Sequence, residues 1–180
     1  MRQKDLHDKL STEMHANHDR IATLARPLDP ERLVRRPAPG SWSVGEVLEH
    51  LVLMDAIFLK PLIPLVARSR MDATSPYRQY EASFVGRKIA ESLENPKPLT
   101  SPRAARPRTP RGGVVEAFLA SDTRFDSLMH DASAHDWNLV RLRPPVAPWI
   151  PLRINIGDVF NIHMVHVRRH LAQIERILAT

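Results

Sequence analysis

The chain of 180 residues contains no cysteine, which excludes disulfides, thiolate metal ligands, iron–sulfur clusters and a nucleophilic thiol. Any transition metal must therefore be held by histidine, aspartate or glutamate, and the nine histidines are the first candidates. No uninterrupted apolar run approaches the ~20 residues that a membrane-spanning helix needs. The segment 1–20 is charged throughout and lacks the apolar stretch of a secretory signal, so we expect a soluble, cytoplasmic protein that does not bind membranes.

Glycine is also scarce, with six residues against 16 prolines, and the clustered prolines mark where helices end. Hydrophobic residues make up 43% of the chain, a fraction near the average of globular proteins, and the length fits one domain over residues 1–180. Strand patterns are weak: residues 140–143 alternate in polarity, but this stretch is too short to found a sheet. The chain shows no internal repeat.

The net charge of +6 is concentrated in one proline-rich stretch, which carries Arg103, Arg106, Arg108 and Arg111. Arginines placed among prolines favour a solvated loop over a basic binding face, so we do not expect nucleic acid as a partner. Nucleic-acid binding through this loop remains the alternative, and it predicts an affinity that falls steeply with salt.

Four segments carry apolar residues at the three- and four-residue spacing of a buried helix face. They are residues 1–26, a segment that starts at about Ser43, residues 113–129 and residues 155–178. Ser43 followed by Glu46 is a capping-box pattern, which predicts the second start. Pro61 and Pro64 should kink or shorten this second helix, although apolar residues continue to Val66.

The segment 70–112 lacks sustained periodicity, apart from a short helix that we expect over residues 83–93. A connection of this length suggests a crossover or a functional loop and allows the second and third long helices to run parallel. Residues 135–155, which carry Trp137 and Trp149, are also irregular. The pattern predicts an all-α fold, a four-helix bundle with a long crossover connection between helices two and three.

The last predicted helix places His163, His166 and His170 on or beside its apolar stripe. A buried imidazole needs a hydrogen-bond partner or a metal. His166 and His170 are four residues apart, so their side chains project side by side and can share one ion. A third ligand must come from another helix, and His50 borders the apolar face of the second helix.

Each of these histidines also has a plainer interpretation as a satisfied residue of the core or its boundary. The others are less favoured as ligands: three lie on the first helix, and His130 and His135 follow the third, where we expect exposure. The three on the first helix are His7, His15 and His18.

Two motifs resemble known ones. The segment 39–51, which reads PGSWSVGEVLEHL, resembles the PGxWSxxEVLxHL segment of the DinB/YfiT-like superfamily, whose members are described as metalloenzymes. The segment 166–174, which reads HVRRHLAQI, is similar to the HxxRHLxQI helix of that superfamily. The motifs occur in the expected order, and together they are fairly specific.

The resemblance implies a four-helix bundle in up-down-down-up order, in which one histidine of helix two and two of helix four bind a divalent metal. Those positions are His50, His166 and His170 in this sequence. His163 is not a ligand in this pattern, and we expect it to be a core residue or one that supports the ligands. The basic insertion between helices two and three and the prolines of helix two depart from the pattern and would reshape the substrate pocket.

Three neutral imidazoles leave a coordination position open for water or substrate, as in catalytic rather than structural zinc sites. Imidazole also suits copper and iron, but we expect zinc or nickel. The resemblance implies a hydrolase or a transferase that uses a low-molecular-weight thiol, acting on a small-molecule substrate. The alternative is a non-catalytic bundle that binds a small ligand or forms a homodimer.

The sequence does not identify a general base. Gln173 could orient a ligand or substrate, or form a hydrogen bond between helices. Glu46 is expected to cap its helix and Glu49 to be solvated. Asp55 is a candidate for holding a metal-binding histidine in place.

Overall fold

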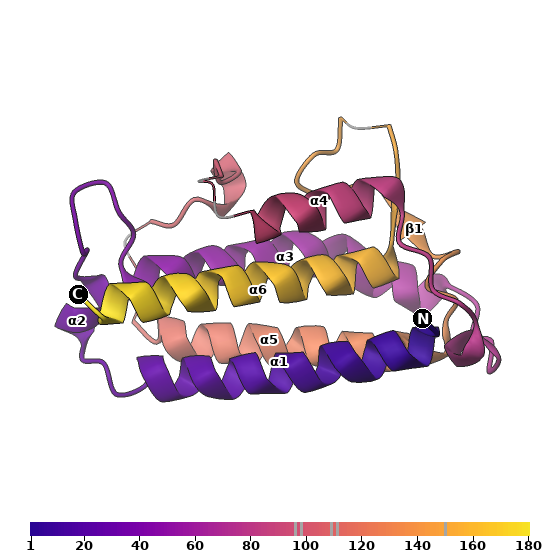
Figure 1. Cartoon of the computed structure of the whole chain (residues 1–180), viewed down its shortest axis with the longest axis horizontal. Helices are drawn as coiled ribbons and strands as arrows, with labels where there is room; N and C mark the ends of the chain where they lie inside the picture. Colours follow the sequence, from indigo (N-terminus) through magenta and orange to yellow (C-terminus); the bar gives the residue numbers. More distant parts are fainter. Residues whose placement is uncertain (96, 98, 109, 111, 150) are drawn as a thin grey trace.

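The computed structural model describes residues 1–95, 97, 99–108, 110, 112–149 and 151–180. Four long helices form a bundle (Figure 1): α1 Gln3–Ala25, α3 Val44–Arg68, α5 Val114–Asp131 and α6 Ile156–Leu178. Two shorter helices join them, α2 Pro30–Val34 and α4 Phe84–Glu94. Short 3-10 turns span Ser75–Tyr77, Arg103–Ala105 and Ala132–Ala134. Strands β1 Arg141–Leu142 and β2 Ile154–Asn155 pair antiparallel, which confirms that this stretch founds no larger sheet.

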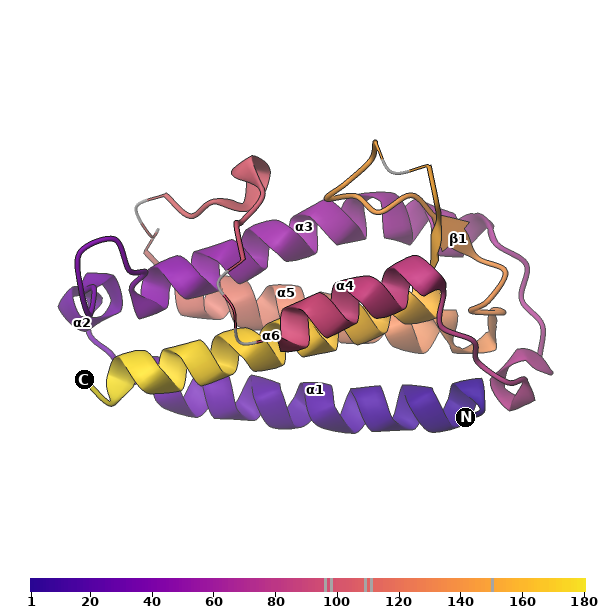
Figure 2. The ribbon, with the colours of Figure 1, turned by 45° about the horizontal axis from the view of Figure 1, so that its top comes forward.

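The helices run in up-down-down-up order, as Figure 1 shows by the colour gradient. Arg20 near the end of α1 forms an ion pair with Glu175 near the end of α6, so these two helices are parallel. The Ser69 hydroxyl, just after α3, lies 2.7 Å from Nδ1 of His135, just after α5, so α3 and α5 are parallel as well. The connection between α3 and α5 is long and contains α4, which lies outside the bundle along α6 (Figure 2).

Local capping explains where two of the bundle helices begin. Ser43 Oγ accepts from the Glu46 amide at 3.2 Å, and the Glu46 carboxylate accepts from the Ser43 amide at 2.9 Å, as the capping box predicts. Asn155 and Asp158 form the same reciprocal pair at the start of α6. The predicted helix ranges are confirmed to within a few residues. The sequence prediction missed α2, although Asp29 before Pro30 is a common helix start.

Helix α3 differs from expectation in two ways. Pro61 and Pro64 lie inside it, but it continues to Arg68 and is not shortened. Its apolar face supplies enough packing to offset the two missing backbone donors. An 18-residue window of α3 has a mean hydropathy of 1.7, enough for a membrane span by length and composition, so the expectation of no such segment is wrong by this measure. Its buried His50 bonds to the Ala105 carbonyl of a loop and its buried Asp55 to His163 of α6, as in a core helix.

The core consists of two apolar clusters separated by a polar layer. On α1 the first cluster reaches Met14 and the second begins at Ile21. On the other bundle helices the same division falls between Leu51 and Phe58 of α3, Leu119 and Phe125 of α5, and Met164 and Val167 of α6. A buried polar side chain lies in this interval on each of the four helices: Asn17, Asp55, Asp122 and His166. The buried histidines His50, His163 and His170 lie within a few residues of it.

Candidate metal centre

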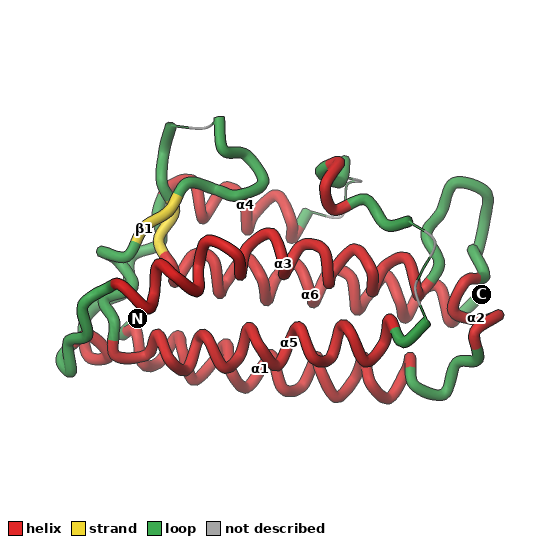
Figure 3. The backbone as a smooth tube through the Cα atoms, turned by 180° about the vertical axis from the view of Figure 1, so that it is seen from behind, coloured by secondary structure: helices red, strands yellow, loops and turns green. Residues whose placement is uncertain are grey.

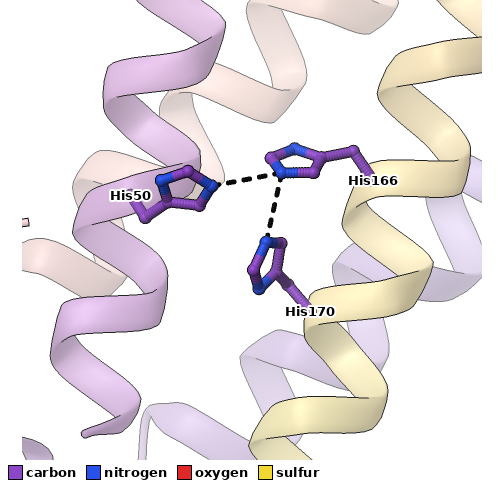
Figure 4. Close-up of side chains that lie close together, drawn as sticks. All are labelled: His50, His166 and His170. Atoms are coloured by element: carbon purple, nitrogen blue, oxygen red, sulfur yellow. Dashed lines mark hydrogen bonds between the residues drawn. The ribbon is translucent and has the colours of Figure 1, made fainter. Parts of the chain in front are cut away.

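Three histidines from two helices converge inside the bundle. His50 lies near the start of α3, and His166 and His170 lie one turn apart on α6 (Figure 4). The Nε2 atom of His166 lies 3.1 Å from Nε2 of His50 and 3.1 Å from Nε2 of His170. All three side chains are buried, and one nitrogen of each ring lies within 4.8 Å of the others. The structure thus brings together the three residues that the sequence singled out.

The hydrogen bonds on the far side of two rings determine which nitrogens carry protons. Nδ1 of His50 lies 2.7 Å from the carbonyl oxygen of Ala105, so it donates its proton there. Nδ1 of His170 lies 2.8 Å from Oε1 of Gln173 and donates in the same way. Each neutral ring therefore presents a bare Nε2 to His166. His166 has one Nε2 proton at most, so it cannot form good hydrogen bonds to both.

A cation resolves this arrangement, because it accepts all three lone pairs at once. Zinc binds histidine nitrogen at about 2.0–2.1 Å, and tetrahedral angles then separate two ligand nitrogens by about 3.3 Å. The two measured separations of 3.1 Å are close to this value. The donor set and its geometry therefore fit one divalent metal ion held by His50, His166 and His170.

Burial keeps the three rings neutral. Desolvation lowers the pKa of His50, although the Ala105 carbonyl opposes this effect. Desolvation, with a smaller contribution from the neighbouring His50, lowers the pKa of His170 to about 3. The pKa of His166 also falls well below its ordinary value, through burial and then through the other two histidines. Neutral imidazole is the form that binds metals, so the site is prepared for an ion at neutral pH.

The basic loop between α4 and α5 contributes a backbone group to this site. Its 3-10 turn Arg103–Ala105 directs the Ala105 carbonyl at His50. The described arginines of the loop, Arg103, Arg106 and Arg108, are exposed, in keeping with a solvated loop, and Arg111 lies outside the described residues. A backbone carbonyl leaves no signal in a sequence, so this partner could not be predicted.

A cavity of about 840 Å³ opens beside the three histidines. Three loops, green in Figure 3 on the side of the bundle away from α1 and α5, supply part of its wall. The residues from these loops are Pro37, Gly40, Ser41 and Trp42 from the first, Leu99, Thr100, Ser101 and Pro102 from the second, and Val146 from the third. The Trp42 ring lies 5.0 Å from the ring of His50 and 6.2 Å from that of His170, and it shields both from solvent.

A second buried cluster adjoins the cavity and crosses the whole bundle. Nδ1 of His163 lies 3.1 Å from the Asp55 carboxylate, and its Nε2 lies 3.3 Å from that of Asp122. The other oxygen of Asp122 lies 3.0 Å from Nδ1 of His18, and the ring of Phe125 stacks on His163 at 3.9 Å. Burial alone would lower the pKa of His163, but the two carboxylates outweigh it and raise the pKa to about 9. His163 is therefore an imidazolium held between two carboxylates.

This cluster corrects one expectation. Asp55 does hold a histidine, but that histidine is His163 and not a member of the metal triad. The sequence analysis did not find Asp122. The spacing along the chain could have indicated it, because Asp122 lies three residues after Leu119 and three before Phe125, on the apolar face of α5.

Two further expectations are wrong. His135 is buried rather than exposed, because the turn after α5 folds back and places it against Ser69. Glu49 is buried rather than solvated, because it lies where α3 packs within the bundle. His130 is exposed, as predicted, and Gln173 bonds to His170 within its own helix rather than between helices.

Comparison with known proteins gives the class to which this fold and site belong. A family model described as the DinB superfamily matches residues 13–174, so the chain belongs to the DinB superfamily. No curated protein matches it. Among solved structures it is similar to YfiT from Bacillus subtilis, described as a probable metal-dependent hydrolase with an unusual four-helix bundle topology. The TM-score is 0.60 at 13% identity, over 96% of this chain and 86% of the YfiT chain.

Proposed function

We propose that this protein is a divalent-metal-dependent hydrolase that acts on a small molecule in the cavity beside His50, His166 and His170. The observation that carries the proposal is the convergence of three neutral imidazole nitrogens at metal-ligand spacing, at the edge of a cavity large enough for a substrate. YfiT, with the same fold, is described as a probable metal-dependent hydrolase, which supports this choice.

A divalent metal bound at such a site supplies Lewis acidity, which polarises a carbonyl or phosphoryl oxygen and makes water a better nucleophile. The protein's own residues supply position. Gln173 and the Ala105 carbonyl fix the orientation of two ligand rings, and such supporting bonds strengthen metal binding. The Trp42 ring packs beside His50 and His170 in the cavity wall and helps to exclude bulk water.

Elemental analysis of protein purified without an affinity tag tests the metal. We expect about one zinc or nickel ion per chain, lost in His50→Ala, His166→Ala and His170→Ala. The exposed His130 provides the matched control, since His130→Ala should retain the metal. If the wild-type protein contains less than one metal ion per chain and all variants fold normally, the result would instead support a non-catalytic ligand-binding bundle.

Product analysis distinguishes hydrolysis from thiol transfer. The metal-loaded protein should cleave a member of a panel of small esters, amides and phosphoesters without added thiol, and His170→Ala should not. Turnover that requires a low-molecular-weight thiol would identify a transferase at the same site. Cytoplasmic location, a homodimer and the absence of nucleic-acid or membrane partners remain proposals from the sequence.

A further inference from the structure

The cavity wall carries two arginine side chains that no described carboxylate pairs. Apart from the neutral metal triad, the charged side chains among the described lining residues are Asp55, His163, Arg169 and Arg176. Asp55 is the one carboxylate in this set, and its oxygens bond to His163 and to the Ser121 hydroxyl, the latter at 2.8 Å. The negative charge of Asp55 therefore faces a buried cation, His163, which it shares with Asp122.

The two arginines have no such match. The Arg169 guanidinium donates to the carbonyl oxygens of Leu93 and Lys97, each at 2.8 Å, and to that of Asn95. These acceptors are neutral, so its positive charge remains. Arg176 is exposed at the edge of the cavity, and in the described part of the chain it has neither a hydrogen-bond nor an ion-pair partner.

Arg176 lies on the cavity face of α6 one turn beyond Gln173. Gln173 uses its amide oxygen for His170, and its amide nitrogen bonds to no other described residue. This part of the wall thus offers hydrogen-bond donors of Arg176 and Gln173 that no described residue uses. A guanidinium beside an amide donor matches a carboxylate, because both oxygens can be bound at once.

Apolar side chains form much of the rest of the wall, together with the hydroxyl-bearing residues Ser41, Thr100, Ser101 and Thr180. Met54 and Phe58 of α3, Ile89 and Leu93 of α4 and Ile177 of α6 line it together with Trp42. Such a surface binds an aryl or alkyl group through burial. A ligand that uses the whole cavity therefore combines an apolar body with a negative charge.

We propose that the substrate class is a small carboxylate with an aryl or alkyl body. Its carboxylate binds Arg176 and Gln173, its body lies against the apolar wall, and its reacting group faces the three histidines. This inference rests on the proposed function, since it names the substrate of the same cavity.

Isothermal titration calorimetry with phenylpropionate and its neutral amide, phenylpropionamide, tests the inference. Each probe is titrated into metal-loaded and into metal-stripped wild-type protein, and into the variants Arg176→Gln and Arg124→Gln. Arg124 is an exposed arginine of α5 that does not line the cavity, so its variant changes net charge equally. Metal-stripped protein is included because a metal ion would itself attract a carboxylate.

We expect the carboxylate to bind metal-stripped wild-type protein about tenfold more tightly than the amide, the size of one charge-assisted contact. Arg176→Gln should remove most of this preference, and Arg124→Gln should retain it. Equal affinity for the two probes in metal-stripped protein, an unchanged preference in Arg176→Gln, or no binding of phenylpropionate to the wild type would each overturn the inference.

The two proposals fail separately. If only the metal-loaded protein binds phenylpropionate more tightly than phenylpropionamide, the metal ion selects the charge. That result would overturn this inference and leave the proposed hydrolase intact. If the protein never retains metal but still binds the carboxylate more tightly than the amide, the hydrolase proposal would be overturned and an anion-binding cavity would remain.

Discussion

The imidazolium of His163 should make the stability of this protein depend on pH in the alkaline range. Between Asp55 and Asp122, the pKa of His163 rises from 6.5 to about 9. A raised pKa means that the folded state binds the proton more tightly than the unfolded state. The resulting stability is fully present below pH 6.5 and is lost as the pH rises through about 9.

The magnitude follows from the change in pKa. One pKa unit corresponds to about 1.4 kcal/mol, so the change at His163 corresponds to on the order of 3 kcal/mol. Little discount for solvent screening is needed, because only 6% of His163 is exposed. The free energy of unfolding should therefore fall by about this amount between pH 6.5 and pH 9.

Urea denaturation of metal-stripped protein at a series of pH values measures this slope. Asp122→Asn removes one carboxylate, so the pKa of His163 should fall. The decrease in the free energy of unfolding at alkaline pH should then be smaller. His163→Gln should remove it entirely, at a cost of about 3–5 kcal/mol at pH 7, because two buried carboxylates lose their cation. The exposed His130 gives the control, since His130→Gln should keep the wild-type slope. An identical slope in wild type and Asp122→Asn would refute the reasoning.

Three other changes test packing, ligand support and capping. Gly157→Ala should destabilise the protein by about 1–3 kcal/mol in urea denaturation, because the new Cβ would lie 2.3 Å from Cε2 of Tyr80; unchanged stability would contradict that contact. Gln173→Leu removes the acceptor for Nδ1 of His170 and should weaken metal binding about 10–100-fold in a competition titration with a chelator, whereas equal affinity would show that this bond does not support the site. Ser43→Ala removes the side-chain cap of α3 and should cost about 1 kcal/mol, also by urea denaturation. Ser127→Ala, at an exposed position of α5, should change the stability little.

The start of α3 shows why helix boundaries could be predicted. The Ser43–Glu46 box satisfies amide groups within four residues of chain, and the apolar spacing that follows needs only the geometry of one helix. The same local reasoning placed His166 and His170 on one face of α6. Pro61 and Pro64 show the limit of such local reasoning, because the packing of α3 in the core outweighed the tendency of proline to end a helix.

Contacts between distant segments required the tertiary structure. The meeting of His50 with the α6 histidines was indicated by motif resemblance, but their spacing and neutral state depend on how α3 and α6 pack. The loop carbonyl of Ala105 and the carboxylate of Asp122 carried no comparable pattern.

The sequence by itself determined where each long helix begins, where every one except α3 ends, and which side chains share its face, because hydrogen bonds and side-chain spacing within a helix are local. Only the tertiary structure decided which polar faces meet. Burial then neutralised the metal triad and two carboxylates charged His163, because a pKa depends on neighbours that the fold, rather than the order of residues, brings together.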